Sequence, residues 1–200
     1  AKSVENIKLK VEALSAAAFE TAANETGAVM IDTRAPQIFA AGFVPNSINI
    51  GIKGDFAPWV GTLITDIEQS ILFIADEESI NDVITRLSRV GYDNIIGYLK
   101  GGIETWIKAG KEIDKIESIS AETFAKTYKE ANGNILVKDV RREAEYAAEH
   151  VNEAECVTLA YMSKNMDAFS KTEPNYIHCG SGYRSMIAAS ILKSRGYDNL

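Results

Sequence analysis

The residues best suited to chemistry lie near the end of the sequence, in the segment Tyr176–Ser185, which reads YIHCGSGYRS. At its centre Cys179 follows an apolar run that predicts a strand, and an amphipathic run from Arg184 to Arg195 predicts a helix that begins at once. A cysteine at this junction lies over a helix N-terminus, where free backbone amides and the helix dipole stabilise a thiolate and lower its pKa.

The residues after Cys179 are suited to hold an anion. Two glycines let the chain curl so that backbone amides converge on the sulfur, and Arg184 adds a positive charge. The predicted anion-binding loop comprises Gly180, Ser181, Gly182, Tyr183 and Ser185. The serines offer hydroxyl donors, although Ser185 could equally cap the helix. The alternative for Cys179 is a small apolar residue at the end of a buried strand, with the glycines serving a tight turn.

Composition narrows the classes of function. A formal net charge of −7 disfavours general nucleic-acid binding but leaves room for small anionic substrates in a local basic pocket. Two cysteines without a CxxC pair or a cysteine–histidine cluster predict no disulfide scaffold, no metal site and no cofactor, and favour a reducing, cytoplasmic setting. No apolar run approaches the roughly 18 residues of a membrane span, so no membrane contact is expected.

The chain repeats itself. The segment that starts IDTRAPQIF is similar to the segment that starts KDVRREAEY 107 residues later, so that Asp32 matches Asp139 and Arg34 matches Arg141. LSAAAF and ISAETF match at an offset of 105 residues, as do GYDNI and GYDNL. Three matches in order, at nearly one offset, indicate two copies of one domain.

Each copy alternates helices and strands. A serine-capped helix precedes a short apolar strand that ends at the Asp-x-Arg motif, and further strands are predicted at 47–50 and 70–75 in the first copy and at 155–159 and 175–179 in the second. This order predicts an α/β fold, with a mostly parallel sheet flanked by helices in each copy and ligands at the carboxyl ends of the strands. The predicted domains are residues 1–110 and 119–200, joined by a linker at 111–118, and the second domain lacks a final strand and helix.

These motifs resemble those of tandem rhodanese-like sulfurtransferases. In that family an Asp-x-Arg follows an early strand, a Gly-His-Ile-like element comes next, and a six-residue loop runs from a cysteine to an arginine. The second copy supplies Asp139, Arg141, His150 and the loop from Cys179 to Arg184, with Glu149 where the family usually has glycine. The first copy supplies Asp32, Arg34 and a late Gly-Gly-x-x-x-Trp that begins at Gly101.

The resemblance implies a reaction. Cys179 would attack the outer sulfur of a donor and hold it as a persulfide, which a thiol or cyanide acceptor then removes. Loop amides would stabilise the sulfur anion and Arg184 would orient a charged donor or acceptor. Related phosphatases and arsenate reductases of this fold have a loop one residue longer, so the shorter loop favours sulfur over phosphate chemistry.

The first copy departs from the family at the nucleophile. After ILFI it reads ADEES, so Ala75 or Asp76 stands where the cysteine should be. Three acidic residues in a row would also repel an anionic donor. This half is therefore predicted to be inactive in catalysis, and the acidic run to be a solvated loop.

Other candidate residues receive structural roles. Asp139, Arg141 and His150 are expected to hold loops together, because the Asp-x-Arg persists in the copy without a cysteine. His178 adjoins Cys179, but neighbouring side chains of a strand point to opposite faces, so His178 is expected to face away from the thiol. Cys156 is expected to be a buried apolar residue.

A second hypothesis makes the chain a sulfur carrier or an interaction module. The segment HCGSGYRSMIAASILKSRGYDN and the unusual ADEES resemble the tandem rhodanese part of metallo-β-lactamase-fold persulfide dioxygenase fusions. The expected partners are therefore small sulfur donors, thiol acceptors and, under this hypothesis, a fused or separate dioxygenase domain of that fold. A start without methionine fits a fragment of such a fusion.

Overall fold

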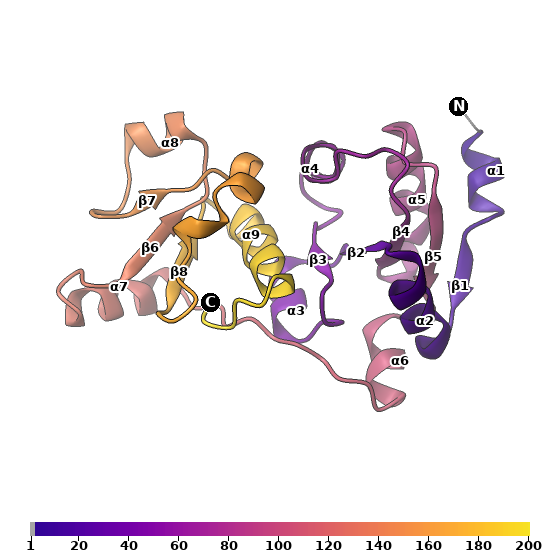
Figure 1. Cartoon of the computed structure of the whole chain (residues 1–200), viewed down its shortest axis with the longest axis horizontal. Coiled ribbons are helices and arrows are strands. Elements are labelled where there is room, and N and C mark those ends of the chain that lie inside the picture. Colours follow the sequence, from indigo (N-terminus) through magenta and orange to yellow (C-terminus); the bar gives the residue numbers. More distant parts are fainter. Residues whose placement is uncertain (1–2) are drawn as a thin grey trace. The chain divides into compact units, whose positions relative to one another are not determined.

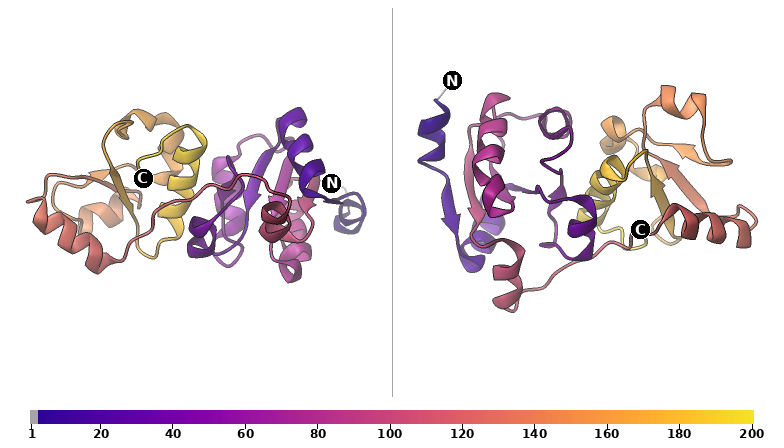
Figure 2. Two further views of the ribbon diagram at one scale, coloured as in Figure 1. Left: turned by 90° about the horizontal axis from the view of Figure 1, so that it is seen from below. Right: turned by 180° about the vertical axis from the view of Figure 1, so that it is seen from behind.

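The computed structural model describes residues 3–200, and the chain divides into two compact units at Lys115/Ile116. Each unit has its own sheet (Figure 1). The segment between the last helix of the first unit and the first helix of the second contains no helix or named strand (Figure 2). Among residues 3–200, no helix is long and apolar enough to cross a membrane.

The first unit contains a five-stranded sheet in which every neighbouring pair of strands is parallel. Figure 1 shows the strands side by side in the order β1-β5-β4-β2-β3. In chain order they are β1 (Glu12–Leu14), β2 (Val29–Asp32), β3 (Ile48–Asn49), β4 (Ile71–Ile74) and β5 (Ile95–Leu99). All four residues of β4 are buried, as expected of a central strand that is covered on both faces.

Helices surround this sheet. They are α1 (Val4–Lys8), α2 (Ala16–Thr26), α3 (Pro36–Ala41), α4 (Phe56–Leu63), the 3-10 helix η1 (Glu77–Ser79), α5 (Ile80–Arg89) and α6 (Gly102–Lys108). Ser15 caps α2 as predicted, since its side chain accepts a hydrogen bond from the Ala18 amide. Phe19 of α2 and Trp106 of α6 pack edge to face in a cluster with Leu72 and other buried residues of the sheet.

The second unit is smaller. Its helices are α7 (Ala121–Glu130), α8 (Glu143–Ala148), the 3-10 helices η2 (Leu159–Lys164) and η3 (Met166–Ala168), and α9 (Tyr183–Ser194). Its strands β6 (Leu136–Asp139), β7 (Glu155–Cys156) and β8 (Asn175–His178) form a parallel sheet in the order β7-β6-β8. Ser120 caps α7, and α9 packs along β8 (Figure 2).

The two sheets share one register. Asp139 pairs with His178 across β6 and β8, as Asp32 pairs with Ile74 across β2 and β4. The central strand β6 corresponds to β2, β7 to β3 and β8 to β4. The described part of the second unit has no counterpart of β5 or β1. The predicted α/β fold with helix-flanked parallel sheets is therefore confirmed.

Two details of the sequence prediction were wrong. The strand predicted at 155–159 ends at Cys156, because the chain turns into η2 at Leu159. Strand β1 was not predicted, because its three residues show no apolar alternation and it forms by pairing with β5 from the far end of the unit.

Candidate active site

Cys179 lies in the tight turn between β8 and α9, at the carboxyl end of the second sheet. Gly182 is the N-cap of α9 with φ 88°, a left-handed conformation that costs a residue with a Cβ atom about 1–2 kcal/mol. Gly180 is not among the residues with positive φ. The turn therefore requires glycine at Gly182, whereas the sequence analysis assigned that role to both glycines.

Hydrogen-bond donors of the loop and of the first turn of α9 surround the sulfur. The Gly182 amide donates to Cys179 Sγ at 3.2 Å and the Ser185 amide at 3.4 Å. Ser185 Oγ lies 3.5 Å from the same sulfur. Because Gly182 occupies the N-cap, Ser185 is not the cap residue, and both its amide and its hydroxyl face the thiol.

These contacts set the ionisation of the thiol. Burial works to raise the pKa of Cys179, but the Ser185 hydroxyl and the amides of Ser185, Ser181 and Gly182 together outweigh it, so that the pKa lies below its ordinary value. The donors stabilise the thiolate, which is the nucleophilic form of cysteine. The loop therefore favours the anionic form of the sulfur.

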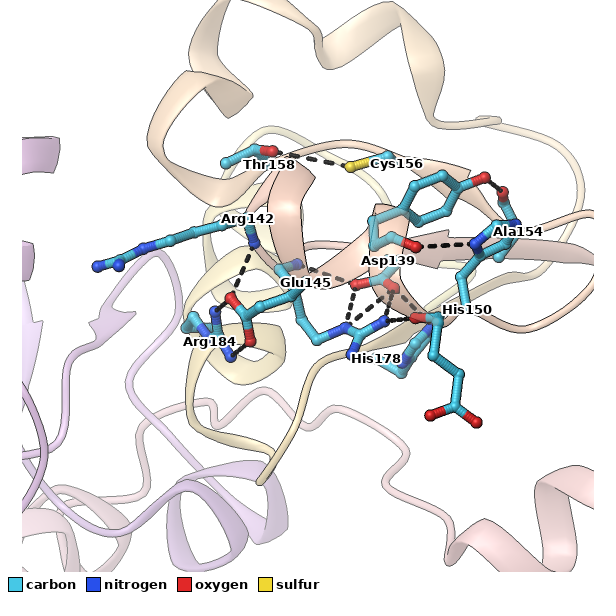
Figure 3. A network of polar contacts seen from close by, with 12 residues as sticks. Asp139, Arg142, Glu145, His150, Ala154, Cys156, Thr158, His178 and Arg184 are labelled. Carbon is cyan, nitrogen blue, oxygen red and sulfur yellow. Dashed lines mark hydrogen bonds and ion pairs between the residues drawn. The ribbon is translucent and has the colours of Figure 1, made fainter.

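Arg184 forms an ion pair that the sequence analysis missed. Its Nη1 donates to Glu145 Oε2 at 2.6 Å and its Nη2 to Glu145 Oε1 at 2.9 Å, a two-pronged contact (Figure 3). The hydrogen bonds from Arg184 lower the pKa of Glu145 to about 2. Glu145 in turn raises the pKa of Arg184, to which the charge of Cys179 and a hydrogen bond with it also contribute.

Glu145 also closes the start of α8. The Arg142 amide donates to Glu145 Oε2 at 3.1 Å, which is the backbone half of a capping box, while the Arg142 side chain extends away from the carboxylate (Figure 3). Glu145 thus joins the helix that follows the Asp-x-Arg motif to the cysteine loop. A glutamate at the third position of a predicted helix was the signal for the cap, but nothing in the sequence identified Arg184 as its partner.

The Asp-x-Arg motif forms the same clasp in both units. Asp139 Oδ2 lies 2.7 Å from Arg141 Nη2, which also donates to the Glu149 carbonyl at 2.7 Å. In the first unit Arg34 likewise binds Asp32 at 2.6 Å and the Gly42 carbonyl at 3.0 Å. The motif therefore ties the end of the central strand to the loop after the next helix, in the unit without a cysteine as well.

Glu149, which stands where the resemblance predicts a glycine, is compatible with this geometry. Its φ is −163°, an extended conformation that any residue adopts. Gly42 at the matching position has φ 170° and is also extended. The backbone therefore does not require glycine here.

The two histidines lie beside these elements. His178 Nε2 is 3.7 Å from Asp139 Oδ2 on the neighbouring strand. Burial works to raise the pKa of Asp139, but the hydrogen bonds from the Arg141 side chain and amide outweigh it, so that the pKa lies below its ordinary value. His150 stacks on Tyr146 with ring centroids 3.9 Å apart, and its Nδ1 is 2.8 Å from the Tyr146 carbonyl.

Cys156 ends β7, with its sulfur 3.8 Å from Thr158 Oγ1. It is half-buried, whereas the sequence predicted a buried residue. Strand β6 separates β7 from β8, and neighbouring strands lie about 4.8 Å apart. Cys156 and the turn that holds Cys179 therefore stand at the same edge of the sheet, with one strand between them.

The register identifies the position in the first unit that matches Cys179. Ile74 occupies the place of His178, so Ala75 occupies the place of Cys179. Asp76 begins the acidic run, whose carboxylate-bearing residues are exposed, and η1 forms where a solvated loop was predicted. A methyl group thus replaces the thiol in this unit.

Comparison with solved structures found similar chains. A thiosulfate sulfurtransferase of Pseudomonas aeruginosa is 18% identical with a TM-score of 0.46, and the match covers 95% of this chain and 42% of that one. The 3-mercaptopyruvate sulfotransferase SseA of Escherichia coli is 16% identical with a TM-score of 0.43, covering 94% and 96%. The rhodanese-like domain of an Anabaena protein is 18% identical with a TM-score of 0.47, covering 55% and 83%.

Among curated sequences, an uncharacterised protein of Buchnera aphidicola is 26% identical over 83 residues. The match covers 42% of this chain and 56% of that protein, so the chain spans little more than half of the relative's length.

The family itself is shown by sequence. The model of the rhodanese-like domain matches residues 15–109 and 120–200, one match in each unit and together most of the chain. The loop from Cys179 to Arg184 lies in the second match, and the Asp-x-Arg clasp lies in both. The chain therefore belongs to the rhodanese-like family, with two rhodanese-like domains in tandem.

Proposed function

We propose that the chain is a sulfurtransferase that carries sulfane sulfur as a persulfide on Cys179. The observation that supports this most directly is the set of donors around the sulfur: the Gly182 amide, the Ser185 amide and the Ser185 hydroxyl, all within 3.5 Å. They stabilise a negative charge on Cys179 and are placed at the start of a twelve-residue helix whose dipole has the same effect.

The reaction proceeds in two displacements. The Cys179 thiolate attacks the outer sulfur of thiosulfate, the sulfur–sulfur bond of the donor breaks, and sulfite leaves with the bonding pair. A low-molecular-weight persulfide reacts in the same way, with its thiolate as the leaving group. Cyanide or an acceptor thiolate then attacks the terminal sulfur of Cys179, and the cysteine thiolate is regenerated.

The first domain takes no covalent part in this reaction. Ala75 offers no nucleophile, and the exposed carboxylates of Asp76, Glu77 and Glu78 oppose the approach of an anionic donor. We assign it a scaffold or docking role.

The carrier hypothesis uses the same cysteine. In that case the persulfide on Cys179 is delivered to, or accepted from, a metallo-β-lactamase-fold dioxygenase, either fused to this chain or separate. Both versions of the proposal place the protein in the cytoplasm, where a reducing environment keeps the two free cysteines as thiols.

Formation of thiocyanate tests the enzyme proposal. The chain is mixed with thiosulfate and cyanide, and thiocyanate is measured with time, with Cys179→Ser and Cys156→Ser proteins alongside. We expect turnover in the unaltered chain and in Cys156→Ser, and none above background in Cys179→Ser. Equal rates in the unaltered chain and in Cys179→Ser would overturn the proposal. Transfer of sulfur to Cys179 without formation of thiocyanate would favour the carrier hypothesis.

A further inference from the structure

We propose that Glu145 is a specificity-determining residue. It makes the loop from Cys179 to Arg184 favour sulfur donors that bear little charge next to the transferred sulfur. This inference rests on the proposed function of Cys179. Glu145 carries no reacting atom, but its carboxylate accepts hydrogen bonds from Arg184, the arginine of the cysteine loop.

The first argument is the geometry of the ion pair. Both terminal nitrogens of Arg184 donate to the two carboxylate oxygens of Glu145, at 2.6 and 2.9 Å. The same arginine interacts with Cys179 by charge and by a hydrogen bond. A carboxylate therefore pairs with the one arginine of the loop that holds Cys179, and Glu145 and Arg184 together contribute almost no net charge to the site.

The second argument comes from the internal repeat. Helix α3 begins four residues after Asp32, and helix α8 begins four residues after Asp139. In this register Ile38 takes the place of Glu145. In the loop, Ile80 takes the place of Arg184, just as Ala75 takes that of Cys179.

The repeat thus separates two kinds of ion pair. The Asp-x-Arg clasp is present in both domains, as expected of an element that maintains the fold. The pair between Glu145 and Arg184 is present where there is a cysteine, and two isoleucines stand in its place where there is none. A pair that the fold can replace by apolar residues is connected with the chemistry of Cys179 and not with the architecture of the domain.

The third argument is the charge of possible donors. Thiosulfate is a dianion whose charges lie on the outer sulfur and on the adjoining sulfonate oxygens. The carboxylate of Glu145 repels these charges. Thiosulfate must also compete with Glu145 for the N–H groups of Arg184. A donor with one charge meets less repulsion. Glu145 consequently lowers the reactivity of dianions relative to that of monoanions.

Two matched donors test this inference. Thiosulfate and methanethiosulfonate both transfer a sulfur bonded to a sulfonyl group, but the second carries one charge instead of two. Glu145→Gln removes the carboxylate charge, while the amide oxygen can still accept from Arg184 and from the Arg142 amide. We expect the ratio of kcat/KM for thiosulfate to that for methanethiosulfonate to rise about tenfold at low ionic strength, the size expected for one charge a few ångströms away.

The control is Glu143→Gln, which removes the same charge from an exposed position in the same turn of α8. We expect its donor ratio to equal that of the unaltered chain. Sulfate, which cannot react, should inhibit the Glu145→Gln protein more strongly than the unaltered chain or the Glu143→Gln protein.

The outcomes separate the two proposals. An unchanged donor ratio in Glu145→Gln, or a parallel loss with both donors, would overturn the role in specificity and leave Glu145 as a cap of α8. If the unaltered chain accepts sulfur from neither donor, the proposed function itself fails. A larger donor ratio together with unaltered thermal stability would establish the specificity role.

Discussion

At the scale of single residues, the behaviour of Cys179 depends on which neighbours donate to its sulfur. Ser185 contributes twice, through its amide and its hydroxyl, whereas Gly182 contributes its amide alone. A backbone amide remains when its side chain is changed, but alanine in place of Gly182 would strain the turn. The Ser185 hydroxyl is therefore the part of this environment that mutation can remove without altering the turn.

The first prediction concerns Ser185→Ala. Loss of the hydroxyl removes one hydrogen bond to the thiolate, so the pKa of Cys179 rises and alkylation by iodoacetamide at pH 7 slows by about two- to tenfold. Peptide mass spectrometry distinguishes Cys179 from Cys156, which is the internal control. An unchanged rate at Cys179 would mean that the hydroxyl does not stabilise the thiolate.

The second prediction concerns pH. Because the folded loop lowers the pKa of Cys179, the thiolate fraction rises with pH through a midpoint below the ordinary value for cysteine. The alkylation rate of Cys179 should therefore level off at a lower pH than that of the same peptide after denaturation in urea. Coincident profiles would contradict the stabilising role of the loop.

At this scale the sequence was informative about residue types and less so about partners. The cysteine, the glycines and the helix start predicted a stabilised sulfur anion, because backbone amides at a helix N-terminus need only the local chain. The pair between Arg184 and Glu145 joins residues 39 positions apart, so only the folded structure brings them together. The choice of Ala75 over Asp76 likewise needed the register of β4.

At the scale of elements, the turn from β8 into α9 determines where the donors point. Gly182 adopts a left-handed conformation as the N-cap of α9, and the first turn of that helix supplies the Ser185 amide. A Cβ atom on Gly180 would come no closer than 3.7 Å to Arg184 Nη2, an ordinary contact. Gly180 therefore has room for a Cβ atom, whereas a Cβ atom at Gly182 would strain the backbone.

The third prediction compares Gly182→Ala with Gly180→Ala. Alanine at Gly182 should destabilise the turn by about 1–2 kcal/mol and slow the loading of Cys179, because a Cβ atom disfavours a positive φ. Alanine at Gly180 should have a much smaller effect on both. Loading rates and thermal unfolding of the two proteins provide the measurement, and equal losses would show that the loop needs both glycines.

The elements themselves were predicted where local rules decide them. Ser15 and Ser120 cap their helices, and the short apolar runs form the inner strands. Strand β1 was missed and β7 was predicted too long, because the limits of a short strand depend on its partner strand and not on its own sequence.

At the scale of the whole molecule, the chain contains two versions of one domain. Each has its own Asp-x-Arg clasp, with the aspartate fully buried in both. The two tryptophans, Trp59 and Trp106, belong to the first domain, and the two cysteines to the second. Tryptophan fluorescence and thiol accessibility therefore report separately on the two domains.

The fourth prediction uses this separation. Asp139→Asn removes the negative charge from the clasp of the second domain and leaves Arg141 without its charged partner, which should destabilise that domain by about 3 kcal/mol. In a urea titration, the unfolding midpoint followed by thiol accessibility should move to a lower urea concentration. The midpoint followed by tryptophan fluorescence should not change. Asp32→Asn should produce the reverse pattern. Movement of both transitions in either variant would mean that the domains unfold as one unit.

The central claim is that Cys179 carries sulfur, and the most direct test is the mass of the protein after reaction with a donor. The chain is incubated with thiosulfate, and separately with glutathione persulfide, then analysed by intact and peptide mass spectrometry before and after cyanide. We predict a gain of about 32 Da, one sulfur atom, on the peptide that contains Cys179, and its loss to cyanide. The absence of this adduct with both donors, in a folded sample with a free thiol, would contradict the account.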